Sequence, residues 1–112
     1  MNQRQANPGH VLVIPRRHLA TVFGLDAATA AALGRATQRI AGAVRSAMES
    51  EDLNIWQSNG VAAGQEIFHL HVHVFPRKPQ DGWFRVYPEG KAPPILDRSE
   101  LSGTAEQIRR AM

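Results

Sequence analysis

The chain has 112 residues, 43% of them apolar, and its 13 basic and 10 acidic side chains give a formal net charge of +3. This length suits one domain over residues 1–112, and no apolar run approaches the roughly 18 residues of a membrane span. Because the basic residues form no long runs, we expect neither a nucleic acid polymer nor a membrane as partner. The lack of cysteine excludes disulfides and thiolate metal sites, and it fits the reducing cytoplasm, where we expect the protein.

The chain opens with a turn and a short strand. Residues 7–9 are Asn-Pro-Gly, a turn signal, and the β-branched run at residues 10–14 predicts a buried strand that stops at Pro15. A basic connector follows, and we interpret its last residue, His18, as structural.

A long amphipathic helix is predicted next. Asp26 is a suitable N-cap, and apolar side chains recur at helical spacing from residue 27 to about residue 50. The face expected to lie on a sheet comprises Leu33, Ala36, Ile40, Val44 and Ala47.

The second half of the chain predicts two more strands and a short helix. We expect a strand at residues 53–58 with Trp56 in the core, a loop of small residues, a strand at residues 65–77, little regular structure at 78–94, and a helix at 98–111. Strands joined by short turns, with the helix segregated from them, indicate an α+β fold with an antiparallel sheet.

Three histidines alternate with apolar residues in the predicted strand at residues 65–77. Side chains on a strand point to opposite faces with a period of two, so His69, His71 and His73 are expected to share one face, roughly 6.5–7 Å apart. Imidazole serves as nucleophile, acid, base or metal ligand near neutral pH. The opposite, core-facing side is expected to carry Phe68, Leu70, Val72 and Val74.

The residues alone leave three interpretations of this histidine row. It is a catalytic site, a metal site, or a polar strand face that happens to hold histidines. Imidazole is a common ligand of zinc, copper and nickel. However, histidines in line at this spacing converge poorly on one tetrahedral ion, for which the Zn–N distance is ~2.1 Å.

The chain resembles the histidine triad (HIT) family of nucleotide hydrolases and transferases. The family signature, His-x-His-x-His followed by two apolar residues, is met at residues 69–75. Residues 8–15 with His18 after them, and the Ala-Gly-Gln at residues 63–65, are also similar to the family. The Pro-Arg at residues 76–77 is more similar to the fragile-histidine-triad and bacterial dinucleoside polyphosphate hydrolase branches than to the phosphoramidase branch.

The resemblance implies cleavage of a small nucleotide at its α-phosphate through a nucleotidyl-histidine intermediate. It makes His71 the nucleophile, held at its other ring nitrogen by the carbonyl of His69, while His73 hydrogen-bonds the phosphate oxygens and His10 lies beside the triad. Dinucleoside polyphosphates and nucleoside phosphoramidates are the substrate classes it suggests. It implies no metal and no cofactor, and it implies a homodimer.

The resemblance also suggests residues that bind the substrate. Gln65 shares the parity of the triad and is expected to contact the bridging oxygen, and Gly64 lets backbone approach the phosphate. Asn59 in the same loop is a further candidate. Trp83 either reaches the partner subunit's site or packs its own loop.

This chain begins almost at the Pro-Gly-His motif, so we expect it to lack the usual N-terminal segment of the family. Asn2 stands near the position of the Asp that grips the ribose, and its side chain offers one acceptor oxygen instead of two. Two rival functions therefore remain: a nucleotide-binding protein with little turnover, and a histidine-based metal-binding protein.

Overall fold

The computed structural model describes residues 1–83, 87 and 90–112. These residues form two compact units, Met1–Asp81 and Gly82–Met112, which we describe separately. None of the helices among the described residues combines the length and apolarity that a bilayer crossing requires.

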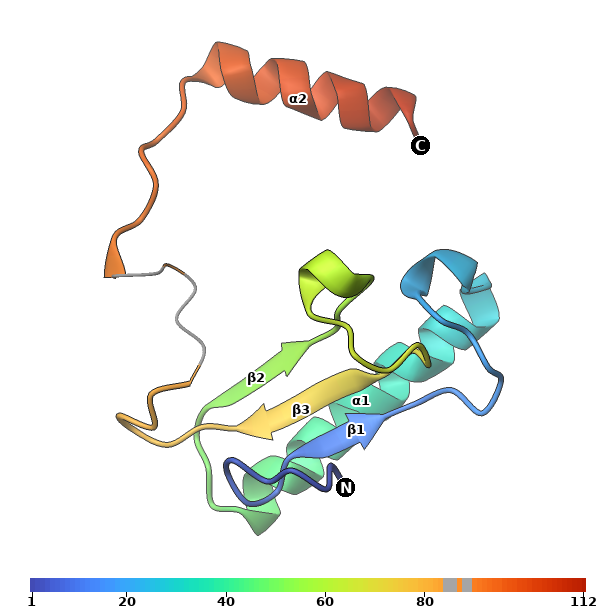
Figure 1. Cartoon of the computed structure of the whole chain (residues 1–112), viewed down its shortest axis with the longest axis vertical. Coiled ribbons are helices and arrows are strands. Elements are labelled where there is room, and N and C mark those ends of the chain that lie inside the picture. The colour runs from blue at the N-terminus through green and yellow to red at the C-terminus, as the bar shows by residue number, and fades with distance from the viewer. Residues whose placement is uncertain (84–86, 88–89) are drawn as a thin grey trace. The chain divides into compact units, whose positions relative to one another are not determined.

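The first unit is a three-stranded antiparallel sheet with one long helix across it (Figure 1). The strands are β1 (Val11–Val13), β2 (Leu53–Trp56) and β3 (Val72–Pro76), in the order β1-β3-β2. Two short 3₁₀ turns, η1 (Val22–Gly24) and η2 (Val61–Ala63), lie in the connections. The predicted α+β fold with an antiparallel sheet is confirmed.

Helix α1 (Ala27–Ala47) begins where the sequence predicts. The side chain of Asp26 accepts a hydrogen bond from the Thr29 backbone N–H at 2.7 Å, which satisfies one of the free N–H groups of the first turn. Val44 is buried as expected, whereas Ala47 is exposed and Thr37 is buried. Thr37 is tolerated there because its hydroxyl donates to the carbonyl of Leu33 at 2.8 Å.

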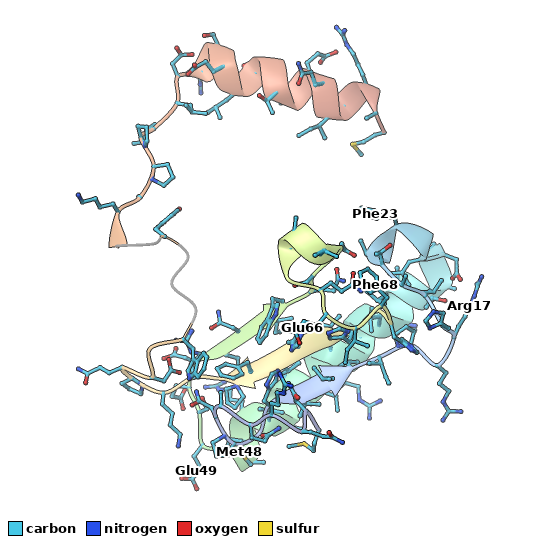
Figure 2. All side chains as sticks on the ribbon, in the orientation of Figure 1. Arg17, Phe23, Met48, Glu49, Glu66 and Phe68 are labelled. Atoms are coloured by element: carbon cyan, nitrogen blue, oxygen red, sulfur yellow. The ribbon has the colours of Figure 1, made fainter. Side chains whose placement is uncertain are left out.

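The predicted histidine strand at residues 65–77 is too long. Only Val72–Pro76 pairs with neighbours, because β1 has three residues and β2 has four. The preceding segment is held instead by a hydrogen bond from the Leu70 N–H to the carbonyl of Leu19 at 2.6 Å. His69 and His71 therefore precede the strand, and Phe68, expected in the core, is 49% exposed. Figure 2 labels Phe68 on the segment that leads into β3.

The strand register gives the sheet one face for the core and one for the site. Val74 lies opposite Val11 and Ile55, and it is completely buried on the side where α1 packs. His73 lies opposite Leu12 and Trp56. Because directly opposed residues share a face, these three side chains belong to the face that α1 does not cover.

Gly9 allows the turn before β1 to approach the end of α1. It has a φ of +92°, and a Cβ atom there would overlap the side chain of Met48. The predicted Asn-Pro-Gly turn is thus present, and it places His10 directly before β1. Asn7 of the same turn is buried and donates to the carbonyl of Pro76 at 2.9 Å.

The second unit contains helix α2 (Arg98–Arg110), close to the predicted helix at residues 98–111. Asp97 and Glu100 form a capping box, in which each side chain accepts from the other's backbone N–H. The described residues between 78 and 94 contain neither a strand nor an α-helix, in agreement with the prediction for that stretch.

Candidate active site

A chain of hydrogen bonds links Asn2, His10 and His73. The Arg4 N–H donates to Asn2 Oδ1 at 3.0 Å, which turns the amide so that Asn2 Nδ2 faces His10 Nδ1 at 3.1 Å and donates to it. The proton of a neutral His10 then lies on Nε2, which is 2.9 Å from His73 Nδ1. His73 accepts this bond at Nδ1, so it carries its own proton on Nε2 as an outward donor.

His71 has the opposite tautomer. Its Nδ1 lies 2.6 Å from the carbonyl oxygen of His69, and a carbonyl only accepts, so the proton of His71 is on Nδ1. The lone pair is left on Nε2 of a partly exposed ring. A neutral imidazole with a fixed lone pair is a competent nucleophile at pH 7.

His69 is held by the connector that follows β1. Its Nε2 donates to the carbonyl of Pro15 at 3.0 Å, so its Nδ1 is an acceptor. The exposed ring of His18 meets His69 edge-on, with the two Nδ1 atoms 3.5 Å apart. His18 was interpreted as structural from the sequence, but it lies at the margin of the triad.

Burial keeps His73 and His10 neutral. It is the main cause that lowers the pKa of His73 to about 4, and the electrostatic influence of the nearby His71 and His10 adds to the shift. Burial also lowers the pKa of His10, while a hydrogen bond to the backbone of Arg4 opposes that change. At pH 7 both rings therefore have the single protons that the chain of hydrogen bonds requires.

Aromatic rings surround this pair of histidines. Trp56 stacks on His73 with 4.1 Å between ring centroids and 3° between planes, and Phe75 meets His10 edge-on at 4.9 Å. Trp56 was expected in the core, yet its register places it on the histidine face. The sequence offered no signal for this, because parity along one strand does not reveal which residues of another strand lie opposite.

Gln65 does not project beside the triad as expected. Gln65 is only 3% exposed, and its side chain forms hydrogen bonds with three backbone groups. Its Oε1 accepts from the N–H of Gly60 at 2.8 Å, while its Nε2 donates to the carbonyls of Ala20 at 2.6 Å and Ile67 at 3.1 Å. Residue 65 precedes β3, so the alternation of side chains along the strand does not extend to it.

The other predicted binding residues of the loop have structural partners as well. Gly64 ends η2 in the left-handed region with φ +80°, which explains the glycine. Asn59 accepts from the N–H of Val22 at 2.8 Å and donates to the side chain of Gln57 at 2.6 Å, which ties η1 to the loop. Asn2, expected to face the ribose, directs its amide at His10 instead.

The structure thus brings His10, His69, His71 and His73 together in the first unit. Trp83 belongs to the second unit, and its expected role stays a prediction. Among the described residues, no three His, Cys, Asp or Glu side chains are arranged to hold a metal ion. His10 Nε2, His69 Nε2 and His71 Nδ1 are each directed at a different protein partner. This geometry defines a histidine site in which the nucleophilic Nε2 of His71 lies in a ring next to His73, whose Nε2–H is a donor.

Comparison with known proteins shows the family of the chain and agrees with its fold. A family model described as HIT domain matches residues 1–80, so the chain belongs to the HIT family. It is 40% identical over 84 residues to the protein hit of Bacillus subtilis, a match covering 74% of this chain and 58% of that protein. It is 40% identical over 73 residues to the adenylylsulfatase HINT3 of Arabidopsis thaliana, covering 65% of this chain and 37% of that protein.

Further similarity extends to hydrolases and to solved structures. A bis(5'-nucleosyl)-tetraphosphatase of Schizosaccharomyces pombe is 33% identical over 81 residues, covering 72% of this chain and 44% of that protein. The crystal structure of SMU.412c from Streptococcus mutans superposes with a TM-score of 0.84 at 34% identity, covering 96% of this chain and 66% of that one. The chain spans between 37% and 58% of the length of the three relatives named here.

Proposed function

We propose that this chain is a nucleotide hydrolase that cleaves at the α-phosphate through a nucleotidyl intermediate on His71. One observation carries the proposal: His71 Nδ1 donates to the carbonyl of His69 at 2.6 Å, which leaves Nε2 as the attacking atom. The names of the relatives support the reaction class, because two of them are hydrolases of nucleotide anhydrides.

The reaction has two displacements. In the first, the His71 Nε2 lone pair forms a bond to the α-phosphorus. The bond from phosphorus to the leaving atom, the bridging oxygen of an anhydride or the nitrogen of a phosphoramidate, breaks with its electron pair on that atom. The His71 ring then carries the nucleotidyl group on Nε2 and a proton on Nδ1, and the His69 carbonyl stabilises the positive ring. In the second, water attacks phosphorus and the P–N bond breaks, which restores neutral His71. The proton lost by the water balances the proton taken up by the leaving oxygen or nitrogen.

His73 supplies a hydrogen-bond donor for the negative charge on the phosphate oxygens. Its Nε2–H is directed outward because its Nδ1 accepts from His10. A donor that is already oriented stabilises the transition state without reorganisation. The proposal therefore assigns no step to a metal or a cofactor.

The loop residues act through the backbone in this proposal. Gln65 fixes residues 60 and 67 around the triad, and Gly64 and Asn59 shape the same loop beside the phosphate. Asn2 acts on the substrate through His10. The proposed substrates are dinucleoside polyphosphates or nucleoside phosphoramidates, and the proposed state is a cytoplasmic homodimer.

Turnover on a substrate panel tests the proposal. Diadenosine triphosphate, diadenosine tetraphosphate, an adenosine phosphoramidate and adenylyl sulfate are each incubated with the protein, with and without EDTA, and nucleoside monophosphate is measured by chromatography. We expect AMP from at least one of them, unaffected by EDTA and lost in His71→Ala. Glu51→Gln, an exposed ion-pair residue, serves as the control and retains activity. Absence of AMP from every substrate, or turnover that requires a divalent ion, would contradict the proposal.

A further inference from the structure

Trp56 stacks face to face on His73, which is a more specific arrangement than packing alone requires. The two residues lie opposite each other on β2 and β3, and their rings are 3° from parallel at a centroid distance of 4.1 Å. The other rings around Trp56 are tilted or edge-on: His10 lies at 5.5 Å and 36°, and Phe75 lies at 5.8 Å and 69°. Only the imidazole of His73 is stacked on the indole among these contacts.

The stack and the hydrogen bond from His10 restrict different motions of His73. The χ2 angle of histidine has broad, roughly two-fold minima, so one hydrogen bond leaves the plane of the ring free to tilt. A parallel indole fixes that plane. The bond from His10 Nε2 to His73 Nδ1 then selects between the two orientations related by a half-turn.

The His73 ring also contacts the ring of His71, the proposed nucleophile. His71 approaches it at 4.9 Å between centroids and 66° between planes. With one face against Trp56 and Nδ1 bonded to His10, the His73 Nε2–H is held in a single direction in a ring that neighbours His71. A donor misplaced by about 1 Å in such a site costs on the order of 100-fold in rate.

We infer that Trp56 is a positioning residue for the reaction, one that holds the plane of His73 so that its Nε2–H is aimed at the phosphate. This inference rests on the proposed function, since it assumes that His73 acts on the substrate. Trp56 itself touches no reacting atom in this account. Nothing in the family signature at residues 69–75 specifies it, because Trp56 lies on another strand.

Trp56 also protects His73 from water. Burial is the largest cause of the low pKa of His73, and the indole covers one face of its ring. The titratable groups that face His73 are His10 and His71, and both disfavour its protonation. Removal of the indole should therefore raise the pKa of His73 towards the ordinary value of 6.5.

Three variants of the whole 112-residue chain test the inference. Trp56→Leu removes the stack, Trp56→Phe retains an aromatic face, and Ile55→Ala changes the neighbouring residue of β2 on the opposite face of the sheet. We expect Trp56→Leu to lower kcat by about 10- to 100-fold with a smaller change in KM. The reason is that the misaligned His73 N–H stabilises the transition state less, while substrate binding changes little. We expect Trp56→Phe to retain kcat within about 3-fold.

Ring NMR signals of His73 give a readout independent of turnover. In the wild-type chain the indole should shift the His73 ring protons upfield, and Trp56→Leu should remove that shift and raise the pKa measured for the ring. Trp56→Phe should keep part of both effects, and Ile55→Ala should change neither.

If the His73 signals or kcat do not respond to Trp56→Leu, the inference is wrong although the proposed function stands. If the wild-type chain has no turnover while the NMR changes occur, the stack is real and the proposed function fails. Equal losses of kcat in Trp56→Leu and Trp56→Phe would also overturn the inference, since the aromatic face would then make no difference and the losses would reflect changed packing alone.

Discussion

The burial of His73 predicts a specific loss of stability in acid. Its pKa in the folded chain is lowered from 6.5 to about 4, so between these pH values the unfolded chain binds a proton that the folded chain does not. Stability therefore rises with pH through this window, is complete above about pH 6.5, and has lost the contribution of this group below about pH 4. His10 acts in the same direction, since burial lowers its pKa too.

The size of the effect follows from the shift. At ~1.4 kcal/mol per pKa unit, a change from 6.5 to about 4 corresponds to about 3 kcal/mol. Because the His73 ring is only partly buried, solvent screening reduces the expected contribution to about 1–2 kcal/mol. This is a large part of the stability of a small domain.

Urea unfolding followed by circular dichroism measures the effect at several pH values from 7.5 to 4. His73→Gln removes the titrating group, so the difference between wild type and variant cancels the carboxylates, including Asp26 and Asp97 with their lowered pKa values. We expect the wild-type chain to lose about 1–2 kcal/mol more than the variant over this range. Parallel losses in the two proteins would show that His73 is not held neutral by the fold, and the reasoning on its tautomer would fail.

Three further predictions concern the loop, the turn and the assembly. Gln65→Ala should lower the free energy of unfolding by about 2–4 kcal/mol in urea titrations, since it removes three hydrogen bonds of a buried side chain, and a loss below about 0.5 kcal/mol would contradict its role. Gly9→Ala should destabilise the chain by about 1–3 kcal/mol, because residue 9 has a positive φ and the added methyl group would overlap Met48. Adding Met48→Ala should recover part of that loss in the same titration, and no recovery would refute the overlap. Sedimentation at micromolar concentration should give the mass of two chains, because short edge strands flank a small sheet, and a clean monomer would rule out the proposed homodimer.

Local sequence predicted the elements well where local interactions determine them. The start of α1 follows from the Asp26 side chain and the helical spacing of apolar residues, and both are properties of adjacent turns. The strand at residues 65–77 was predicted too long because alternation of side chains is necessary for a strand but does not supply pairing partners. The length of β3 depends on β1 and β2, which are distant in the sequence.

The site was predicted only in part for the same reason. The approach of His10 to the triad came from the resemblance, and the structure places its Nε2 2.9 Å from His73 Nδ1. The stack of Trp56 and the backbone contacts of Gln65 were missed, because each depends on register and loop path. His18 was assigned to structure, since nothing local indicates that the connector passes beside His69.

The most direct test of the account is to trap the reaction intermediate. The protein is mixed with the best substrate of the panel, denatured at neutral to alkaline pH so that a phosphorus–nitrogen bond survives, and digested for mass spectrometry with fragmentation across residues 69–73. The account predicts a nucleotidyl group on His71, and none in His71→Ala. A label on His69 or His73, or rapid turnover without any labelled histidine, would contradict it.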